Sequence, residues 1–206
     1  MKKILISILM ALPLMASAQD NTWERVEEAP ASKESRDAKY LVENAVPEKD
    51  GKVCFETTIE APGKSASEIY NILLSQLTKM TKEPNQIERS FVAIKDSVNH
   101  KLGAIFQEWL VFKSAALSLD RTEFNYQIIC ECFDGKANVS LGRIVYLYEA
   151  ERDPQKYLAE EWITDKYCVN KKHTKLLPIS GKFRRKTIDR KDFIFNKFES
   201  LLNEKK

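Results

Sequence analysis

The densest group of charged side chains in the chain is the basic stretch 180–193, SGKFRRKTIDRKDF, which holds six Lys and Arg against two Asp. Guanidinium and ammonium groups bind carboxylates and phosphates, and Arg does so with a planar fork. The stretch therefore predicts contact with an acidic protein or with an anionic component of the cell envelope. The candidate binding residues are Lys171, Lys172, Lys175, Arg184, Arg185 and Lys186.

A second use of these cations lies within the chain itself, because the charge is unevenly divided along the sequence. Residues 19–165 carry 18 basic and 26 acidic side chains, whereas residues 166–206 carry 13 basic and 4 acidic ones. The basic segment can therefore neutralise the acidic remainder of the same protein. The sequence leaves both uses open.

Catalytic groups are sparse. Cys168 and His173 are five residues apart and could form a nucleophile and base, but no nucleophile elbow or orienting acid surrounds them. The chain has no P-loop, no G-x-G-x-x-G, no H-E-x-x-H and no G-x-S-x-G motif. An enzyme of the envelope, hydrolase-like, remains the alternative to a binding protein. No cofactor is expected.

The cysteines do not define a metal site or a disulfide pattern. Cys130 and Cys132 form a C-x-C pair on one face of an expected strand, and the chain has only two histidines to add as ligands. No metal is therefore expected. Together with Cys54 and Cys168 they allow three disulfide pairings, between which the sequence does not choose. Small buried thiols are the simpler interpretation.

The N-terminus indicates export. Lys2 and Lys3 precede a short apolar run, and Ala16-Ser17-Ala18 matches a signal-peptidase site, so residues 1–18 are expected to be a signal peptide cleaved near Ala18. The run is too short to span a bilayer. We expect a protein of the periplasm or the cell surface, not a transmembrane one. Residues 19–50 lack periodicity and are expected to be a flexible extension, with a short helix allowed near 33–44.

Residues 51–206 are expected to form one α+β domain. The segment 52–60 alternates as a half-buried strand, and Ser65 with Glu68 forms a capping box for a helix that ends near Lys82. Four strands are expected over 90–95, 103–112, 123–133 and 137–149, with a hairpin turn at Asp134-Gly135. About five strands in the order β-α-β-β-β-β-α predict a single antiparallel sheet with helices on one face.

Two further helices are expected near the C-terminus. Asp153 and Pro154 have the types preferred at a helix start, which predicts a helix over 154–167. The basic segment 166–186 contains Pro178 and Gly181 and is expected to be irregular. A last helix is expected to begin at Thr187.

Aromatic residues follow the expected strands. Half of them should pack under the helices, and the others should line the open face of the sheet, where Trp109 alternates with Phe106 and Phe112. An exposed aromatic row would mark a binding or dimer surface, so Trp109 joins the candidate binding residues and a homodimer is one option. The alternative is that residues 19–50 or 150–180 cover this face.

Two segments resemble a known family. VCFETTIEAPGKSASEIYNILLSQL and AEEWITDKYCVNKKHTKLLPISGKFRRKTIDRKDFIFNKFESLL are similar to the start and end of an exported bacterial domain of unknown function with a TATA-binding-protein-like (TBP-like) fold. The resemblance spans roughly 52–203 and implies a curved antiparallel sheet. It brings no catalytic residues.

A fold of this kind does not carry a function with it. An exported, nearly neutral chain is not expected to bind nucleic acid. The sequence therefore favours a non-catalytic binding module, with a self-associating structural protein as a further option.

Overall fold

The computed structural model describes residues 37–115 and 118–204. The expected signal peptide and the first part of the expected extension lie outside these residues. No helix in the described ranges is both long enough and apolar enough to cross a membrane. The elements are β1 (Glu48–Lys49), β2 (Lys52–Glu60), β3 (Phe91–Asp96), β4 (Lys101–Ala115), β5 (Ser118–Phe133), β6 (Lys136–Tyr148) and β7 (Gln155–Leu158), with helices α2 (Ala38–Leu41), α3 (Ala66–Met80), α4 (Ala159–Trp162), α5 (Asp165–Cys168) and α6 (Pro178–Asn203).

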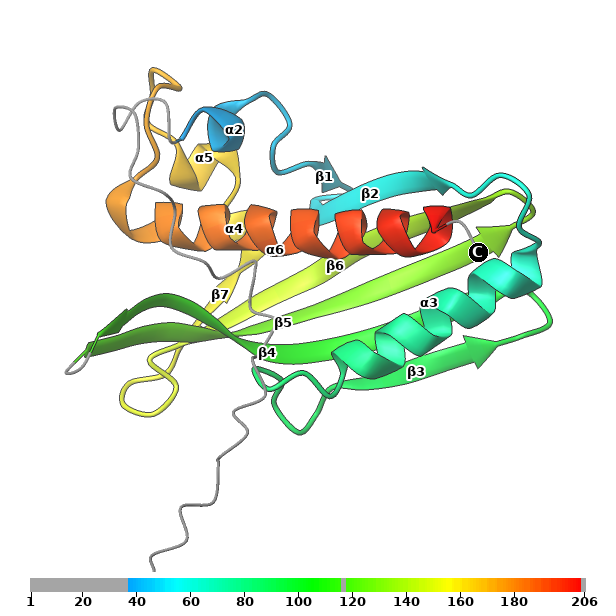
Figure 1. Cartoon of the computed structure of the whole chain (residues 1–206). Coiled ribbons are helices and arrows are strands. Elements are labelled where there is room, and N and C mark those ends of the chain that lie inside the picture. The colour runs from blue at the N-terminus through cyan, green and yellow to red at the C-terminus, as the bar shows by residue number, and fades with distance from the viewer. Residues whose placement is uncertain (1–36, 116–117, 205–206) are drawn as a thin grey trace, which may run out of the picture.

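The strands form one antiparallel sheet, which confirms the predicted α+β class. Its order is β1-β2-β6-β5-β4-β3, and β7 pairs with β6 beside the end of β2. Both long helices lie against the same face of the sheet (Figure 1), with α6 on the β2 side and α3 on the β3 side. On the other face of the sheet, which we call the open face, none of the described residues forms a helix.

The first strand and helix form as the sequence predicts. Val53, Phe55 and Ile59 alternate inward along β2, where they are buried. The Ser65 side chain accepts a hydrogen bond from the backbone of Glu68, whose carboxylate accepts from the Ser65 backbone, and this capping box starts α3. The hairpin between β5 and β6 turns at Gly135, whose φ of +77° suits glycine.

The expected helix over 154–167 is wrong. Residues 155–158 form β7, which pairs with 145–148 of β6, and only two short helices, α4 and α5, follow. A long-range contact explains the difference. Strand β2 pairs with β6 only over 136–142, and the backbone groups on the rest of that edge of β6 pair with β7 instead. With β1 and β7 added, the sheet has seven strands where about five were expected.

The expected start of the last helix is also wrong. Helix α6 begins at Pro178, nine residues before Thr187, because proline is well suited to the first helical position. Gly181 lies inside the helix for a packing reason, since a Cβ there would stand 2.9 Å from the Cβ of Leu176. The basic stretch therefore lies on the first turns of a 26-residue helix, not in an irregular segment.

The described part of the expected N-terminal extension, residues 37–50, packs on the domain. Tyr40 of α2 is 3% exposed, and its hydroxyl donates to Asp189 of α6 at 3.0 Å. Val46 is buried, and β1 pairs with the start of β2. These residues are a folded edge of the sheet and not a free linker.

The expected aromatic row on the open face is not found among the described residues. Most strand aromatics face the helices, where their rings form one cluster. A register shift in β4 between Val111 and Lys113 accompanies the placement of Phe112 on that side. The inward-facing rings are Phe106, Phe112, Phe124, Tyr126, Tyr146 and Tyr148.

Candidate functional site

Arg184 lies inside the protein. Its side chain is 0% exposed; Nε donates to the carbonyl of Tyr40 and Nη1 to the carbonyl of Ile163, both at 2.8 Å. Nη2 lies 2.7 Å from a carboxylate oxygen of Asp165. These contacts of the Arg184 guanidinium connect α2, α4 and α5 with α6. The buried guanidinium is therefore not available to a binding partner.

Two neighbours of Arg184 also have internal partners. The Nε and Nη2 of Arg185 donate to the two carboxylate oxygens of Asp37 at 2.6 and 2.8 Å. Lys182 Nζ donates to Asp120 at 2.7 Å. Lys186 is half-buried. Much of the charge of the basic stretch therefore neutralises acidic side chains of the same chain.

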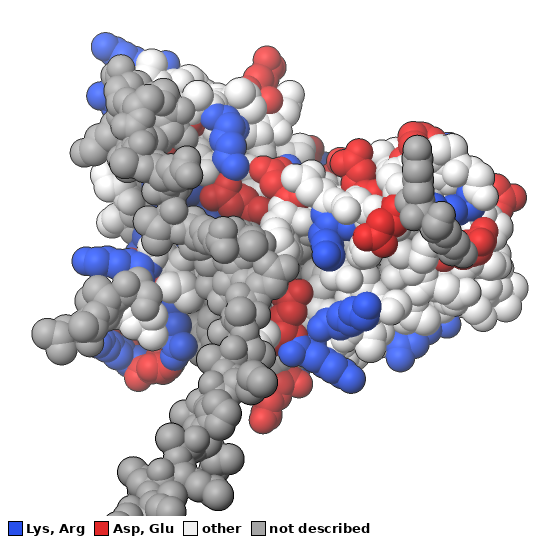
Figure 2. All heavy atoms as spheres, viewed as in Figure 1, with Lys and Arg blue, Asp and Glu red and all other residues white. Residues whose placement is uncertain are grey.

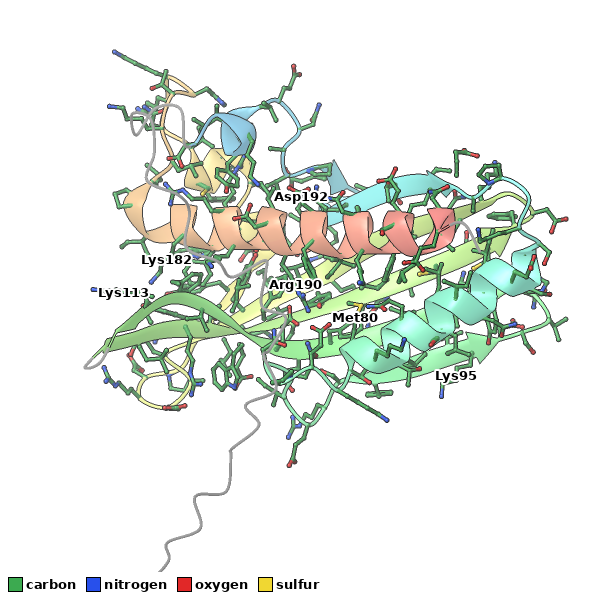
Figure 3. All side chains as sticks on the ribbon, in the orientation of Figure 1. Met80, Lys95, Lys113, Lys182, Arg190 and Asp192 are labelled. Atoms are coloured by element: carbon green, nitrogen blue, oxygen red, sulfur yellow. The ribbon has the colours of Figure 1, made fainter. Side chains whose placement is uncertain are left out.

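A buried polar cluster joins Arg190 of α6 to Glu108 of β4. Neither residue was among the candidate site residues of the sequence. Arg190 and Glu108 are both 0% exposed, and Arg190 donates to both oxygens of Glu108 at 2.8 Å. Arg190 also donates to Glu83 at 2.9 Å, while Asn85 and Gln86 donate to Glu108. Figure 3 shows Arg190 pointing from α6 toward the sheet.

The electrostatics of this cluster favour the charged state of the arginine. Burial is the largest single influence and acts to lower the pKa of Arg190, but Glu108, Tyr126 and Glu83 together outweigh it, so the pKa is raised. For the neighbouring Tyr126 phenol, burial has the opposite effect and raises the pKa well above its usual value, because the charged form is the anion. Neither Glu108 nor Arg190 lines the three hollows described below, of about 170, 360 and 560 Å³. The contacts of this cluster connect α6 with β4 and with the segment that follows α3.

What remains of the predicted binding set is a group of lysines just before α6. Lys171, Lys172 and Lys175 are exposed, and no carboxylate of the described residues forms an ion pair with them. We call residues 166–179 the lysine tip. In Figure 2, Lys and Arg side chains project at the end of the molecule that carries α5 and the start of α6.

The lysine tip has a defined backbone. The Asn170 side chain accepts from the backbone of Thr174 at 2.8 Å and of Lys175 at 3.1 Å, and the Asn170 N–H donates to the Lys175 carbonyl at 3.0 Å. Val169 and Leu176 form an isolated bridge that closes the loop. The lysines are therefore presented from a closed loop whose own hydrogen bonds hold its shape.

The lysine tip also carries three exposed apolar side chains. Ile179 is 64% exposed, and Tyr167 and Leu177 are 40% exposed. In an ordinary solvated lysine loop, nothing favours the exposure of aliphatic side chains. The lysine tip differs from such a loop because it exposes apolar groups together with cations.

Trp109 lies apart from the lysine tip, on the open face of the sheet. The guanidinium of Arg121 stacks over its ring at 3.6 Å, and Arg121 pairs with Glu151. A hollow of about 170 Å³ adjoins these residues and Leu119. The predicted binding residues thus fall into two separate places, and the structure does not join Trp109 to the basic segment.

The Cys168 and His173 pair does not assemble as a catalytic dyad. Cys168 is fully buried and burial raises its pKa, whereas His173 is exposed with its Nδ1 3.9 Å from Asp165. No contact between the Cys168 thiol and the His173 ring is found in the described part of the chain. All four cysteines are free thiols, and no group of three metal-ligating side chains occurs among the described residues.

Thiol reactivity follows from this burial. Near pH 8 we expect Cys54, which is half-buried, to react first with a disulfide reagent, and slowly, because burial raises its pKa. Burial raises the pKa of Cys132 to about 11 and that of Cys130 further, so both should react only after unfolding. Timed labelling with mass spectrometry checks the order. Fast labelling of Cys168 in the native protein would instead indicate an activated thiol.

Comparisons with known proteins identify the family. A family model described as a domain of unknown function (DUF4468) with TBP-like fold matches residues 55–147. A solved DUF4468 protein from Bacteroides ovatus is 41% identical, with a TM-score of 0.75, and the alignment covers 82% of this chain and 96% of that one. The chain belongs to the DUF4468 family.

A more distant structure supports the same fold. A TBP-like protein from Parabacteroides distasonis is 21% identical, with a TM-score of 0.65, and the alignment covers 79% of this chain and all of that one. A search of curated proteins finds no match. The comparisons therefore confirm the predicted family and the TBP-like fold, and they assign no biochemical activity.

Proposed function

We propose that this protein is an exported, non-catalytic binding module that docks on an anionic lipid surface of the cell envelope through its lysine tip. The leader-like N-terminal sequence supports action outside the cytoplasm. One observation carries the proposal: Lys171, Lys172 and Lys175 are exposed and have no acidic partner within residues 37–115 and 118–204, while neighbouring basic residues are paired within the fold.

The apolar neighbours favour lipid over an acidic protein. Ile179, Leu177 and Tyr167 are exposed beside the lysines, and side chains of these types enter the boundary between headgroups and acyl chains. Lysines near an anionic bilayer surface contribute about 1 kcal/mol each, so three of them give weak, reversible docking. Apolar insertion would strengthen that docking and make it partly resistant to salt.

Vesicle flotation tests the proposal with the full-length mature protein. We expect it to float with vesicles of phosphatidylglycerol and phosphatidylcholine, and not with phosphatidylcholine alone. Raising the salt concentration should release much of it, because screening weakens surface electrostatics. Ile179→Ser should weaken binding severalfold without lowering thermal stability, since Ile179 is 64% exposed.

The controls separate lipid from other anions. Soluble polyglutamate at equal charge should compete poorly. If polyglutamate displaced the protein completely and Ile179→Ser bound as the wild type does, the partner class would be an acidic protein. If anionic vesicles did not retain the wild type at low salt, the lipid-docking proposal would be wrong.

A further inference from the structure

In the part of the chain that the structure describes, no strand pairs with the outer edge of β2 beyond Val53, and we call this stretch the free edge. On one side, residues 54–60 pair with 142–136 of β6. On the other side, β1 pairs only with Lys52 and Val53, and the Cys54 N–H donates to the Pro47 carbonyl at 3.1 Å. Beyond that point the segment 42–47 no longer pairs with β2.

The backbone groups on this edge can be assigned by alternation. Successive residues of an antiparallel strand direct their N–H and C=O groups to opposite sides. The Cys54 N–H donates toward the β1 side, so the backbone groups of Glu56, Thr58 and Glu60 also face that side. In agreement, the Glu60 carbonyl accepts a hydrogen bond from the Asn203 side chain at 3.1 Å. Between these two contacts, the outward backbone groups of Glu56 and Thr58 have no hydrogen-bond partner among the described residues.

A hollow of about 360 Å³ lies next to this edge on the helix side of the sheet. Apolar side chains make up much of its lining, and Lys191 lies 5.6 Å from the centre of the Phe55 ring. A side chain of an added strand placed opposite Thr57 would point to this face, because facing residues share a pleat. The apolar residues that line this hollow include Val42, Ala45, Phe55, Ile188 and Phe195.

A second hollow, of about 560 Å³, lies on the open face beside the same strand. Its lining is acidic and polar, with Glu56, Thr58, Glu131 and Asn138. Glu56 pairs with Lys49 and Glu131 with Lys101, but these exposed pairs are weak and can be exchanged. Side chains of an added strand opposite Glu56 and Thr58 would lie over this acidic hollow.

We propose that the free edge of β2 binds an extended peptide segment of another protein, in which apolar side chains alternate with Lys or Arg. The peptide backbone pairs with the outward groups of Glu56 and Thr58 and continues the line of β1. Its apolar side chains enter the helix-side hollow, and its basic side chains lie beside Glu56, while Glu131 adds to the negative charge of that face. This site is separate from the lysine tip and does not depend on lipid binding.

A second copy of this chain fits the edge less well. Antiparallel self-pairing centred on Thr57 would bring Glu56, Glu60 and Glu131 of both copies to one face, where like charges are destabilising. A basic alternating peptide meets the same acidic face with opposite charge. Charge complementarity therefore selects the peptide over the homodimer.

The test uses a blocked, fluorescein-labelled Ser-Lys-Val-Lys-Val-Lys-Ser peptide and the mature protein. We expect saturable binding at low salt by fluorescence anisotropy, and at least tenfold slower hydrogen exchange of the Glu56 and Thr58 amides. A Glu56→Lys/Glu131→Lys variant should bind this peptide about tenfold more weakly and should bind the Ser-Glu-Val-Glu-Val-Glu-Ser peptide instead.

Two further variants separate backbone pairing from charge attraction. Glu88→Lys/Glu199→Lys makes the same charge change at exposed positions elsewhere, and it should bind the lysine peptide as the wild type does. Thr58→Pro removes one outward N–H from an edge strand and should reduce binding of the lysine peptide, with the melting temperature as the check on folding. Unchanged exchange at residues 56 and 58 with bound peptide, or equal loss in both charge variants, would overturn the proposal. So would an edge-paired dimer that the peptide cannot dissociate.

Discussion

Replacing Arg190 by methionine is expected to lower the free energy of unfolding by about 3–5 kcal/mol, the range seen when one partner of a buried ion pair is removed. The change leaves the Glu108 carboxylate, which is 0% exposed, without the two hydrogen bonds that it accepts from Arg190. Urea denaturation followed by circular dichroism measures the effect.

The matched control removes both charges. Glu108→Leu combined with Arg190→Met should recover most of the lost stability, because an apolar pair of similar volume needs no charge compensation. Asn85 and Gln86 lose an acceptor in that variant, so recovery should be incomplete. A double variant as unstable as the single one would show that the packing of Arg190, and not the buried charge, accounts for the loss.

Replacing Arg184 by alanine is expected to cost about 2–4 kcal/mol and to release the segment 37–47 from α6. Two buried carbonyl oxygens, of Tyr40 and Ile163, would lose their donors, at about 1–3 kcal/mol each if they stay dry. Urea denaturation gives the stability loss, and limited proteolysis should show new cleavage near residues 37–50.

The adjacent arginine provides the control for this prediction. Arg185→Ala removes the pair with Asp37, but the Arg185 side chain is 35% exposed, so the loss should not exceed about 1 kcal/mol. Equal losses at the two positions would contradict the internal role of Arg184. Alanine substitutions across Arg184, Arg185 and Lys186 together would therefore report on folding before they report on any partner.

The elements that the sequence predicts well are those whose signals are local. Alternation over 52–60, the capping box at Ser65 and the turn at Gly135 each depend on neighbours within a few residues, and each is found in the structure. The segment 154–167 failed because local helix-start residues at Asp153 and Pro154 were outweighed by the unpaired edge of β6, which is a tertiary feature.

The assignment of the basic stretch to a surface failed for a related reason. Its composition shows excess charge, but pairing is fixed by residues far away in sequence, such as Asp37 for Arg185 and Glu108 for Arg190. One signal was available in the sequence. Glu108 is two residues from both Phe106 and Leu110, so in a strand its side chain points to the same buried face as theirs. A carboxylate in the core requires a buried cation as its partner.

The measurement that most directly tests lipid docking compares two triple variants in one flotation experiment. Lys171→Ala/Lys172→Ala/Lys175→Ala removes three exposed lysines of the tip, and Lys82→Ala/Lys95→Ala/Lys197→Ala removes as many exposed lysines elsewhere. At about 1 kcal/mol for each lysine, the tip variant should bind anionic vesicles about a hundredfold more weakly than the wild type, and the control should lose far less. Equal weakening of the two variants would mean that net charge drives binding, and the lysine tip would have no special role.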